Sequence, residues 1–292
     1  MNSITVNAYA KINLSLDILG TLPNGYHEVQ MIMQSLTLHD TLTLTRTEEN
    51  DILLTCSDLS LPVDEKNLAY RAAASFLKHF NILSGISIDL KKKIPCAAGL
   101  AGGSSDAAAV LRGMNELFAT NASEEELAAI GVTLGADVPY CLFLGTALSE
   151  GIGERLTRLP AAPGCFCLLV KPEAGASTGQ IYKSYDALEP TGVIAHPQTD
   201  LLLTALRTQD YPLLCEKLCN VLEPVTARLV PEVDTLRRTL STLGADGVRM
   251  SGSGPTVFGL FSDEDTAEKA AGHMKAAGYY NTFLTKFFQP DK

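Results

Sequence analysis

Long apolar runs are absent from this sequence of 292 residues. No stretch approaches the ~20 residues that cross a bilayer, so no membrane partner is expected. The first residues, Met1-Asn-Ser-Ile-Thr-Val, lack the basic region and apolar core of a secretion signal. The seven cysteines are odd in number and scattered, without a Cys-x-x-Cys pair. These absences predict reduced thiols in a cytoplasmic protein rather than disulfides or a zinc site.

Positive charge is also scarce. Lysine and arginine together number 23 against 33 acidic residues, which gives a net charge of −10. This balance argues against a nucleic-acid partner. It leaves a phosphorylated ligand possible, because backbone amides and a few lysines set the field inside a cleft. The composition, 46% hydrophobic and 19% charged, is that of a globular protein with an ample core in one large or two medium domains.

The most informative segment is glycine-rich and runs from Pro95 to Asp106. After it, apolar residues follow the spacing of one helix face: Ala107, Val110, Leu111, Met114, Leu117 and Phe118. The glycines therefore stand where a helix begins, and there free N–H groups and the helix dipole attract an anion. Glycine permits positive φ and close approach of a phosphate. Ser104 and Ser105 add hydroxyls for a phosphate oxygen or a hydrated cation.

Other readings of this loop are open on residue grounds. A plain turn before a helix also contains glycine. The sequence has no Walker A motif, Gly-x-x-x-x-Gly-Lys-Ser/Thr, and this turn lacks the dinucleotide pattern Gly-x-Gly-x-x-Gly. The length of the Gly/Ser cluster and its abrupt junction with a long amphipathic helix favour phosphate binding.

Periodicity and turn residues predict a mixture of strands and helices. We expect strands at 4–19, 36–46, 51–56 and 86–90, a turn at Asn24-Gly25, and helices at 67–80 and from the capping box at Ser123 to 131–135. Pro160, Pro163 and Gly164 follow Leu159, and we place a domain change there, with domains 1–159 and 160–292. The second half predicts a strand at 165–170, helices at 201–206 and 231–243, a strand at 256–261, a helix at 265–277 and a last strand to 288. Without regular βαβ alternation, the fold class is α+β.

Three blocks carry a family resemblance. The loop reads Pro-x-x-x-Gly-Leu-Ala-Gly-Gly-Ser-Ser-x-Ala-Ala, Ala8-Tyr-Ala-Lys-Ile-Asn-Leu14 stands near the start, and Met250-Ser-Gly-Ser-Gly-Pro-Thr256 near the end. In this order they resemble the motifs of the galactokinase, homoserine kinase, mevalonate kinase and phosphomevalonate kinase superfamily. Gly25-Tyr-His27, Gly135-Ala-Asp-Val-Pro139 and Gly151-Ile-Gly-Glu154 resemble, within it, the 4-diphosphocytidyl-2-C-methyl-D-erythritol kinase family. Ala101 departs from the pattern, since that family usually has glycine there.

The resemblance implies a fold and a donor site. It implies an N-terminal ATP-binding domain similar to the second domain of ribosomal protein S5, a ferredoxin-like C-terminal domain, and an active cleft between them. ATP is the implied phosphoryl donor, with Mg²⁺ bridging its phosphates. The implied ATP-binding residues are Pro95, Ala97, Ala98, Gly99, Leu100, Ala101, Gly102, Gly103, Ser104 and Ser105. Ser104 or Ser105 is the candidate near the magnesium ion, and no dedicated carboxylate cage is evident.

The resemblance also assigns catalytic roles. Asp137 matches the catalytic aspartate, and Lys11 is its expected partner, keeping it ionised and stabilising the moving phosphoryl group. On spacing alone, Asp137 reads as a cap or turn residue and Lys11 as an outward strand lysine. Lys91-Lys-Lys93, the one basic run, is either a solvated strand end or the border of the nucleotide.

Substrate recognition rests on other residues. The resemblance implies that Tyr26 and Tyr182 stack on the two faces of a cytosine and that His27 hydrogen-bonds its edge. Thr178 would lie near the substrate phosphates, Asn13 would bind the methylerythritol hydroxyls, and residues 251–254 would support the loop and line the acceptor site. Without the resemblance, Tyr182 reads as half-buried packing.

The implied activity is transfer of the γ-phosphate of ATP to the 2-hydroxyl of 4-diphosphocytidyl-2-C-methyl-D-erythritol, a step of non-mevalonate isoprenoid synthesis, by a monomer or homodimer. One alternative is a sister kinase acting on mevalonate derivatives or homoserine. Another is an inactive ligand sensor on the same fold. The Tyr26/His27 pair favours the cytidylyl substrate, and retention of Lys11 and Asp137 argues against the sensor.

Overall fold

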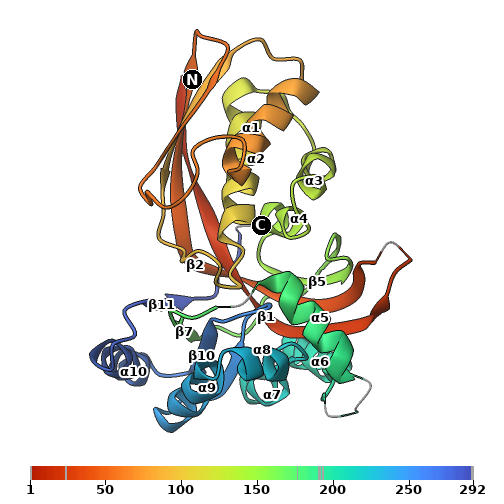
Figure 1. Cartoon of the computed structure of the whole chain (residues 1–292), viewed down its shortest axis with the longest axis vertical. Coiled ribbons are helices and arrows are strands. Elements are labelled where there is room, and N and C mark those ends of the chain that lie inside the picture. Colours follow the sequence, from red (N-terminus) through yellow and green to blue (C-terminus); the bar gives the residue numbers. More distant parts are fainter. Residues whose placement is uncertain (1, 24, 176, 190–191, 193, 291–292) are drawn as a thin grey trace. The chain divides into compact units, whose positions relative to one another are not determined.

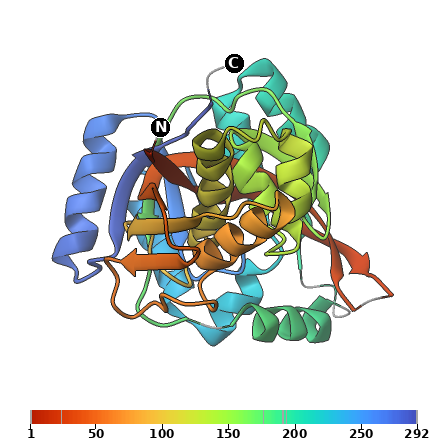
Figure 2. The same cartoon turned by 90° about the horizontal axis from the view of Figure 1, so that it is seen from above.

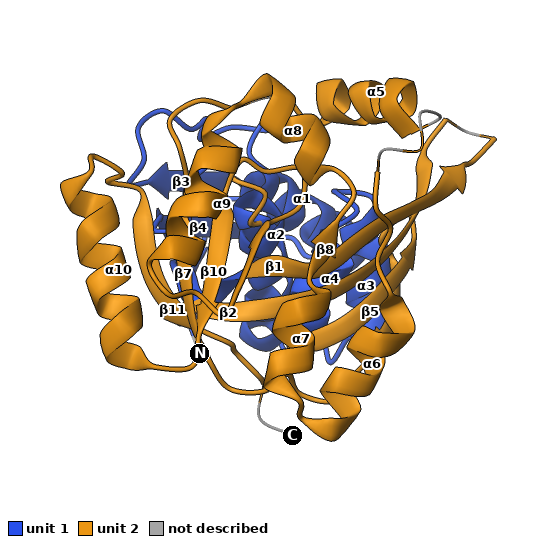
Figure 3. Cartoon of the chain, turned by 90° about the horizontal axis from the view of Figure 1, so that it is seen from below, with its two compact units in different colours: residues 1–10, 38–96, 101–144 blue, residues 11–37, 97–100, 145–292 orange. Residues whose placement is uncertain are grey.

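The chain forms two compact units in the computed structural model, which describes residues 2–23, 25–175, 177–189, 192 and 194–290. Unit 1 consists of residues 1–10, 38–96 and 101–144, and unit 2 of residues 11–37, 97–100 and 145–292 (Figure 3). We describe each unit by itself. Asn24 of the turn predicted at Asn24-Gly25 lies outside the described residues. The predicted domain boundary after Leu159 stays a prediction, since the units interleave along the chain.

Two long strands contribute to both units. β1 spans Ser3–Thr21 and β2 spans His27–Thr47. The unit boundary falls after Ala10 in β1 and after Thr37 in β2. The strand predicted at 36–46 starts nine residues earlier, at His27. The sequence pattern concealed this extension because residues 31–36 are all buried, so apolar and polar residues do not alternate there.

Unit 1 packs helices on a sheet. β3 (Ile52–Cys56) pairs in parallel with β4 (Gly85–Lys91), which pairs antiparallel with β2, and β1 lies on the other side of β2. The helices are α1 (Leu68–His79), α2 (Gly102–Phe118), α3 (Glu124–Val132) and α4 (Val138–Phe143). α1 and α2 lie against each other (Figure 1). α2 approaches β2 so closely that a Cβ on Gly113 would lie 2.5 Å from Leu44 Cδ1.

Unit 2 contains the other end of the long sheet. Here β1 pairs in parallel with β8 (Cys219–Asn220), and β2 pairs antiparallel with β5 (Thr146–Gly151), which pairs with β6 (Arg155–Arg158). Unit 2 also contains four helices, α5 (Thr178–Leu188), α6 (Thr199–Thr208), α7 (Tyr211–Lys217) and α8 (Glu223–Leu229).

Unit 2 also contains an antiparallel sheet of four strands in the order β11-β7-β10-β9. These strands are β7 (Phe166–Val170), β9 (Gly247–Met250), β10 (Val257–Phe261) and β11 (Thr282–Lys286). α9 (Glu232–Thr242) and α10 (Glu264–Ala276) pack against it, and α10 runs beside β11 in Figure 2. The mixture of elements confirms the predicted α+β class.

Most predicted elements are present with shifts of a few residues. The helix predicted from Ser123 is confirmed, with the Ser123 hydroxyl accepting the Glu126 N–H at 3.2 Å. The sequence did not predict α4, α5, α7, α8, β5, β6, β8 and β9. None of the helices among the described residues combines the length and apolarity that a bilayer crossing requires.

Candidate active site

Helix α2 begins in the glycine loop, as predicted. Its N-cap residue, Ala101, makes no capping hydrogen bond through its side chain. The N–H groups of the first turn, from Gly102 to Ser104, therefore depend on other acceptors. The loop thus has the features expected of an anion site: small residues, a helix start and no competing side-chain cap.

The positive φ expected at the glycines of this loop is found at Gly99 (72°), and two alanines also adopt it, Ala97 (49°) and Ala101 (57°). Gly102 and Gly103 are helical. A Cβ on Gly102 would lie 3.1 Å from Ile94 Cγ2, so glycine here gives space rather than conformational freedom.

The two serines of the loop have different surroundings. Ser105 is buried, and its hydroxyl donates to the Tyr9 carbonyl oxygen and, at 3.4 Å, to Cys141 Sγ. It therefore ties the start of α2 to β1 and α4. Ser104 is half-buried and lies beside the turn at Gly135. A Cβ added to Gly135 would lie 3.8 Å from Ser104 Oγ. Of the two hydroxyls, Ser104 is the one that a ligand can reach.

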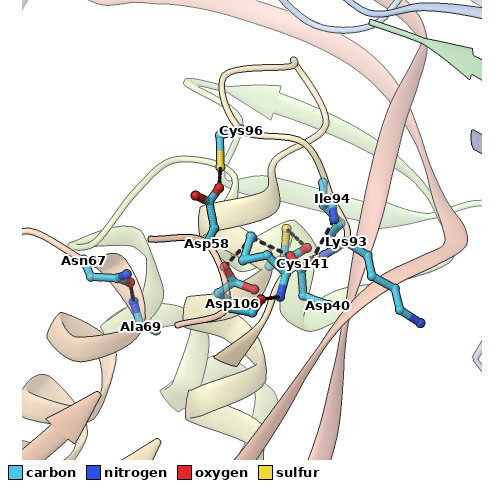
Figure 4. A network of polar contacts seen from close by, with 12 residues as sticks. Asp40, Asp58, Asn67, Ala69, Lys93, Ile94, Cys96, Asp106 and Cys141 are labelled. Carbon is cyan, nitrogen blue, oxygen red and sulfur yellow. Dashed lines mark hydrogen bonds and ion pairs between the residues drawn. The ribbon is translucent and has the colours of Figure 1, made fainter. Parts of the chain in front are cut away.

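A buried ion network lies directly behind the loop (Figure 4). Lys92 Nζ is 2.5 Å from Asp40 Oδ2 and 2.7 Å from Asp106 Oδ2, and its side chain is 7% exposed. Asp40 also accepts hydrogen bonds from the N–H groups of Lys93 and Ile94. Asp106 stands in α2 beside the loop, and its Oδ1 atom is buried without a partner.

This network holds one ammonium and two carboxylates, so its charges do not balance. Burial raises the pKa of the Asp106 carboxyl to about 7, and the neighbouring Asp40 charge adds to the rise while Lys92 opposes it. Burial by itself would lower the pKa of Lys92, but the charges of Asp106 and Asp40 outweigh it and raise that pKa. One ammonium cannot fully compensate two carboxylates.

This network bears on the two readings of the basic run Lys91-Lys-Lys93. Lys92 is not a solvated strand end, because it is buried between two aspartates, and the reading that one of the three lysines borders the nucleotide stays a prediction. The solvated reading applies to Lys91, whose side chain is 68% exposed. Sequence reasoning missed Asp40 and Asp106 as partners, since Asp40 lies 52 residues from Lys92.

Asp137 stands at the start of a short helix. It is the N-cap residue of α4 and stands in a turn, in line with the cap or turn reading, but its side chain makes no capping hydrogen bond. Its carbonyl oxygen accepts the Cys141 N–H at 3.1 Å. The turn that contains it, from Gly135, passes beside Ser104, which brings the segment of Asp137 to the loop within unit 1.

Lys11 belongs to unit 2 and is 4% exposed, so it is not an outward strand lysine. Its Nζ donates to Asn13 Oδ1 at 2.8 Å, and Asn13 Nδ2 donates to Met31 Sδ at 3.3 Å. A Cβ on Gly252 would lie 3.4 Å from Lys11 Nζ. The first and third motifs therefore meet around this ammonium.

The third motif supports the first part of the glycine loop, as predicted. The Ser251 hydroxyl donates to the Gly99 carbonyl oxygen at 2.9 Å, and the Lys11 N–H donates to Leu100 at 3.2 Å. Asn220 also fixes the third motif, because its side-chain amide donates to the carbonyl oxygens of Met250 and Gly252, each at 2.8 Å. Sequence reasoning missed Asn220. The signal was a polar residue within the apolar run Leu218 to Leu222.

The predicted recognition residues also lie in unit 2. Tyr26 is 61% exposed, and His27 is the first residue of β2. The centroid of the His27 ring lies 4.8 Å from the centroid of the Tyr182 ring, which stands on α5. Thr178 begins α5, with its hydroxyl 3.0 Å from that of Ser253. Their roles toward a substrate stay predictions.

Sequence comparison gives matches along nearly the whole chain. Residues 67–145 match the family described as GHMP kinases N terminal domain, and residues 202–280 match GHMP kinases C terminal. A protein of Lachnoclostridium phytofermentans named 4-diphosphocytidyl-2-C-methyl-D-erythritol kinase is 49% identical over 290 residues, 99% of each chain. One of the same name from Lachnospira eligens is 45% identical over 99% of this chain and 100% of its own.

Structure comparison agrees. A crystal structure of 4-(cytidine 5'-diphospho)-2C-methyl-D-erythritol kinase matches with a TM-score of 0.83 at 32% identity, covering 98% of this chain and 100% of that one.

Proposed function

The chain belongs to the 4-diphosphocytidyl-2-C-methyl-D-erythritol kinase family of GHMP kinases, and on this premise we propose that it phosphorylates the 2-hydroxyl of 4-diphosphocytidyl-2-C-methyl-D-erythritol with ATP. This reaction supplies isoprenoid precursors by the non-mevalonate route. We place it in the cytoplasm, in a monomer or homodimer with an N-terminal ATP-binding domain at 1–159 and a C-terminal domain at 160–292.

The observation that carries the proposal is the start of α2. Its first-turn N–H groups follow small residues and meet no side-chain cap, which is the arrangement that favours a polyphosphate. Residues 95–105 would hold the ATP phosphates, with Ser251 fixing the loop backbone at Gly99. Phosphoryl transfer needs little covalent chemistry from the protein, so positioning of this kind supplies much of the rate.

Two residues would act on the reacting groups. Asp137 would accept the proton of the acceptor hydroxyl, a role supported by the Gly135 turn, which brings its segment beside Ser104 of the loop. Lys11 would stabilise negative charge on the transferring phosphoryl group. Its burial supports this role, because a charge acts more strongly away from water.

Magnesium would reach the protein through few ligands. Among the described residues, no cluster of three His, Cys, Asp or Glu side chains could hold a metal ion. The Ser104 hydroxyl fits the role, since it is half-buried at the loop while that of Ser105 is engaged by Tyr9. When bound with ATP, Mg²⁺ would neutralise phosphate charge and keep several of its waters, so a carboxylate cage would not be required.

Recognition of the cytidylyl group would depend on Tyr26, His27 and Tyr182. The contact of His27 with Tyr182 and the exposure of Tyr26 support a site where a base stacks on aromatic rings. Thr178 and Asn13 would contact the diphosphate and the methylerythritol hydroxyls.

A substrate panel tests the activity. The purified protein would be assayed with ATP and Mg²⁺ on the cytidylyl methylerythritol compound, mevalonate and homoserine. We expect phosphorylation of the first alone. Transfer to mevalonate or homoserine, without transfer to the cytidylyl compound, would overturn the proposal, and transfer to none would favour the sensor.

A further inference from the structure

His27 is paired with an acidic residue that no motif of the sequence indicated. Its Nε2 atom lies 2.7 Å from Oδ1 of Asp186, which stands in α5. The His27 side chain is 13% exposed and that of Asp186 is 50% exposed. The two residues are 159 positions apart in the sequence, so only the fold of unit 2 brings them together.

The same helix holds the ring in a second way. Tyr182 and Asp186 are four residues apart in α5 and therefore lie on one face. Tyr182 contacts the His27 ring at 4.8 Å with an angle of 42° between the rings. α5 thus holds the imidazole by one contact to the ring and one directional hydrogen bond.

The hydrogen bond determines where the proton of a neutral imidazole stands. An ionised carboxylate only accepts hydrogen bonds, so Nε2 must carry the hydrogen that points to Asp186. In the neutral ring, the other nitrogen, Nδ1, then keeps a lone pair and is an acceptor. A carboxylate in this position therefore fixes the tautomer as well as the orientation of the ring.

An acceptor at this place distinguishes two pyrimidines. Cytosine carries an amino group at position 4, a donor, whereas uracil carries an oxygen there, an acceptor. We propose that Asp186 is a specificity-determining positioning residue, which holds His27 as the Nε2–H tautomer so that Nδ1 accepts from the cytosine amino group and disfavours uracil. This inference rests on the proposed function.

The chain offers a matched control. The pair borders a cavity of about 310 Å³, whose lining includes His27, Asp186 and Glu189. Glu189 lies just past the end of α5 and supplies a second carboxylate to this cavity. His27 is paired with Asp186 and not with Glu189. Glu189→Gln therefore removes the same charge from the same cavity without touching the hydrogen bond.

The kinetic test compares two acceptors, the cytidylyl compound and its uridylyl counterpart. We expect Asp186→Asn to reduce the ratio of kcat/KM between them by roughly 10-fold, because an amide can also donate to Nε2 and release the tautomer. The KM for ATP should stay unchanged in the variant, and Asp186→Glu should restore part of the preference. Glu189→Gln should keep the wild-type ratio.

A spectroscopic test does not depend on activity. The nitrogen-15 signals of the His27 ring, assigned by their loss in His27→Gln, report the tautomer directly. At pH 8 we expect the Nε2–H form in the wild type and in Glu189→Gln, and a mixture in Asp186→Asn. An Nδ1–H ring or a protonated ring in the wild type at pH 8 would overturn the inference.

Failure of the inference and failure of the proposed function give different results. If the wild type phosphorylates the cytidylyl compound but Asp186→Asn keeps its full preference over the uridylyl one, Asp186 has no role in specificity. The same holds if the wild type accepts both compounds equally. If the wild type phosphorylates neither, the proposed function fails whatever tautomer His27 adopts.

Discussion

Ala101 is the residue at which the loop is most evidently under strain. It adopts φ 57° at the N-cap of α2, a left-handed conformation that costs a non-glycine residue about 1–2 kcal/mol. The resemblance implies glycine at this position, and the left-handed backbone gives a conformational reason for it, since the alanine retains the loop at a cost in stability.

We predict that Ala101→Gly raises the free energy of unfolding by about 1 kcal/mol, measured by urea denaturation. The gain is smaller than the full strain because glycine is more flexible in the unfolded chain. Ala98→Gly serves as control, since Ala98 has no positive φ and is buried, and it should destabilise. Equal effects of both changes would show that Ala101 is not strained.

Asp137 tests the catalytic assignment at the same scale. Asp137→Asn keeps the shape of the side chain but removes the proton acceptor, so kcat should fall by roughly 10²–10⁴-fold while substrate binding changes little. Lys11→Ala should also lower kcat, and the double variant should lose less than the product of both factors, because the residues act on one transition state. A kcat for Asp137→Asn within a few-fold of wild type would refute the role of base.

Tyr26 tests recognition of the base. Its side chain is 61% exposed, so Tyr26→Ala should leave the thermal stability almost unchanged. The KM for the cytidylyl substrate should rise, because the loss of one stacking partner weakens its binding free energy by about 1–3 kcal/mol, while the KM for ATP stays constant. If both KM values rise together, Tyr26 does not act on the cytosine.

At the scale of elements, the network behind α2 joins three parts of unit 1. Asp40 comes from β2, Lys92 follows β4, and Asp106 is in α2. A group with a raised carboxyl pKa in the native state binds its proton more tightly when the protein is folded. Its contribution to stability is complete below the unfolded pKa, near 4, and is lost as the pH rises through about 7.

We therefore predict that Asp106→Asn changes the pH dependence of unfolding. In the wild type, Asp106 should lower the free energy of unfolding between pH ~4 and ~7, by at most about 1.4 kcal/mol per pH unit. Urea titrations at several pH values should show this slope weakened in Asp106→Asn. Asp58→Asn is the control: hydrogen bonds from Ser60 lower the pKa of Asp58, so its linkage lies at lower pH and the slope should persist. An identical slope in wild type and Asp106→Asn would contradict the prediction.

At the scale of the molecule, the sequence predicted features that depend on local order. The loop and α2 were predictable because small residues precede a clear helical period, and the Ser123 cap was predictable from its capping box. Contacts across the chain were not, since nothing local marks Asp40 or Asp186 as a partner. α5 was not predicted, and Gly179 in its first turn weakens the helical signal there, yet this helix contains the residues that contact His27. Burial excluded the reading of Lys11 as an outward strand lysine, which the sequence could not do.

The interleaving of the two units has a consequence for synthesis of the chain. All of unit 1 lies within the first 144 residues, whereas unit 2 combines residues 11–37 with segments that extend to the C-terminus. Domains generally fold as their chain emerges from the ribosome, so unit 1 can assemble while translation continues. The early strand segments of unit 2 must wait with unpaired edges, for instance at Ser15 and Leu16, until Cys219 and Asn220 have been made. A ribosome that stalls between these points would display a finished unit 1 beside exposed strands, the kind of nascent chain that holdase chaperones bind.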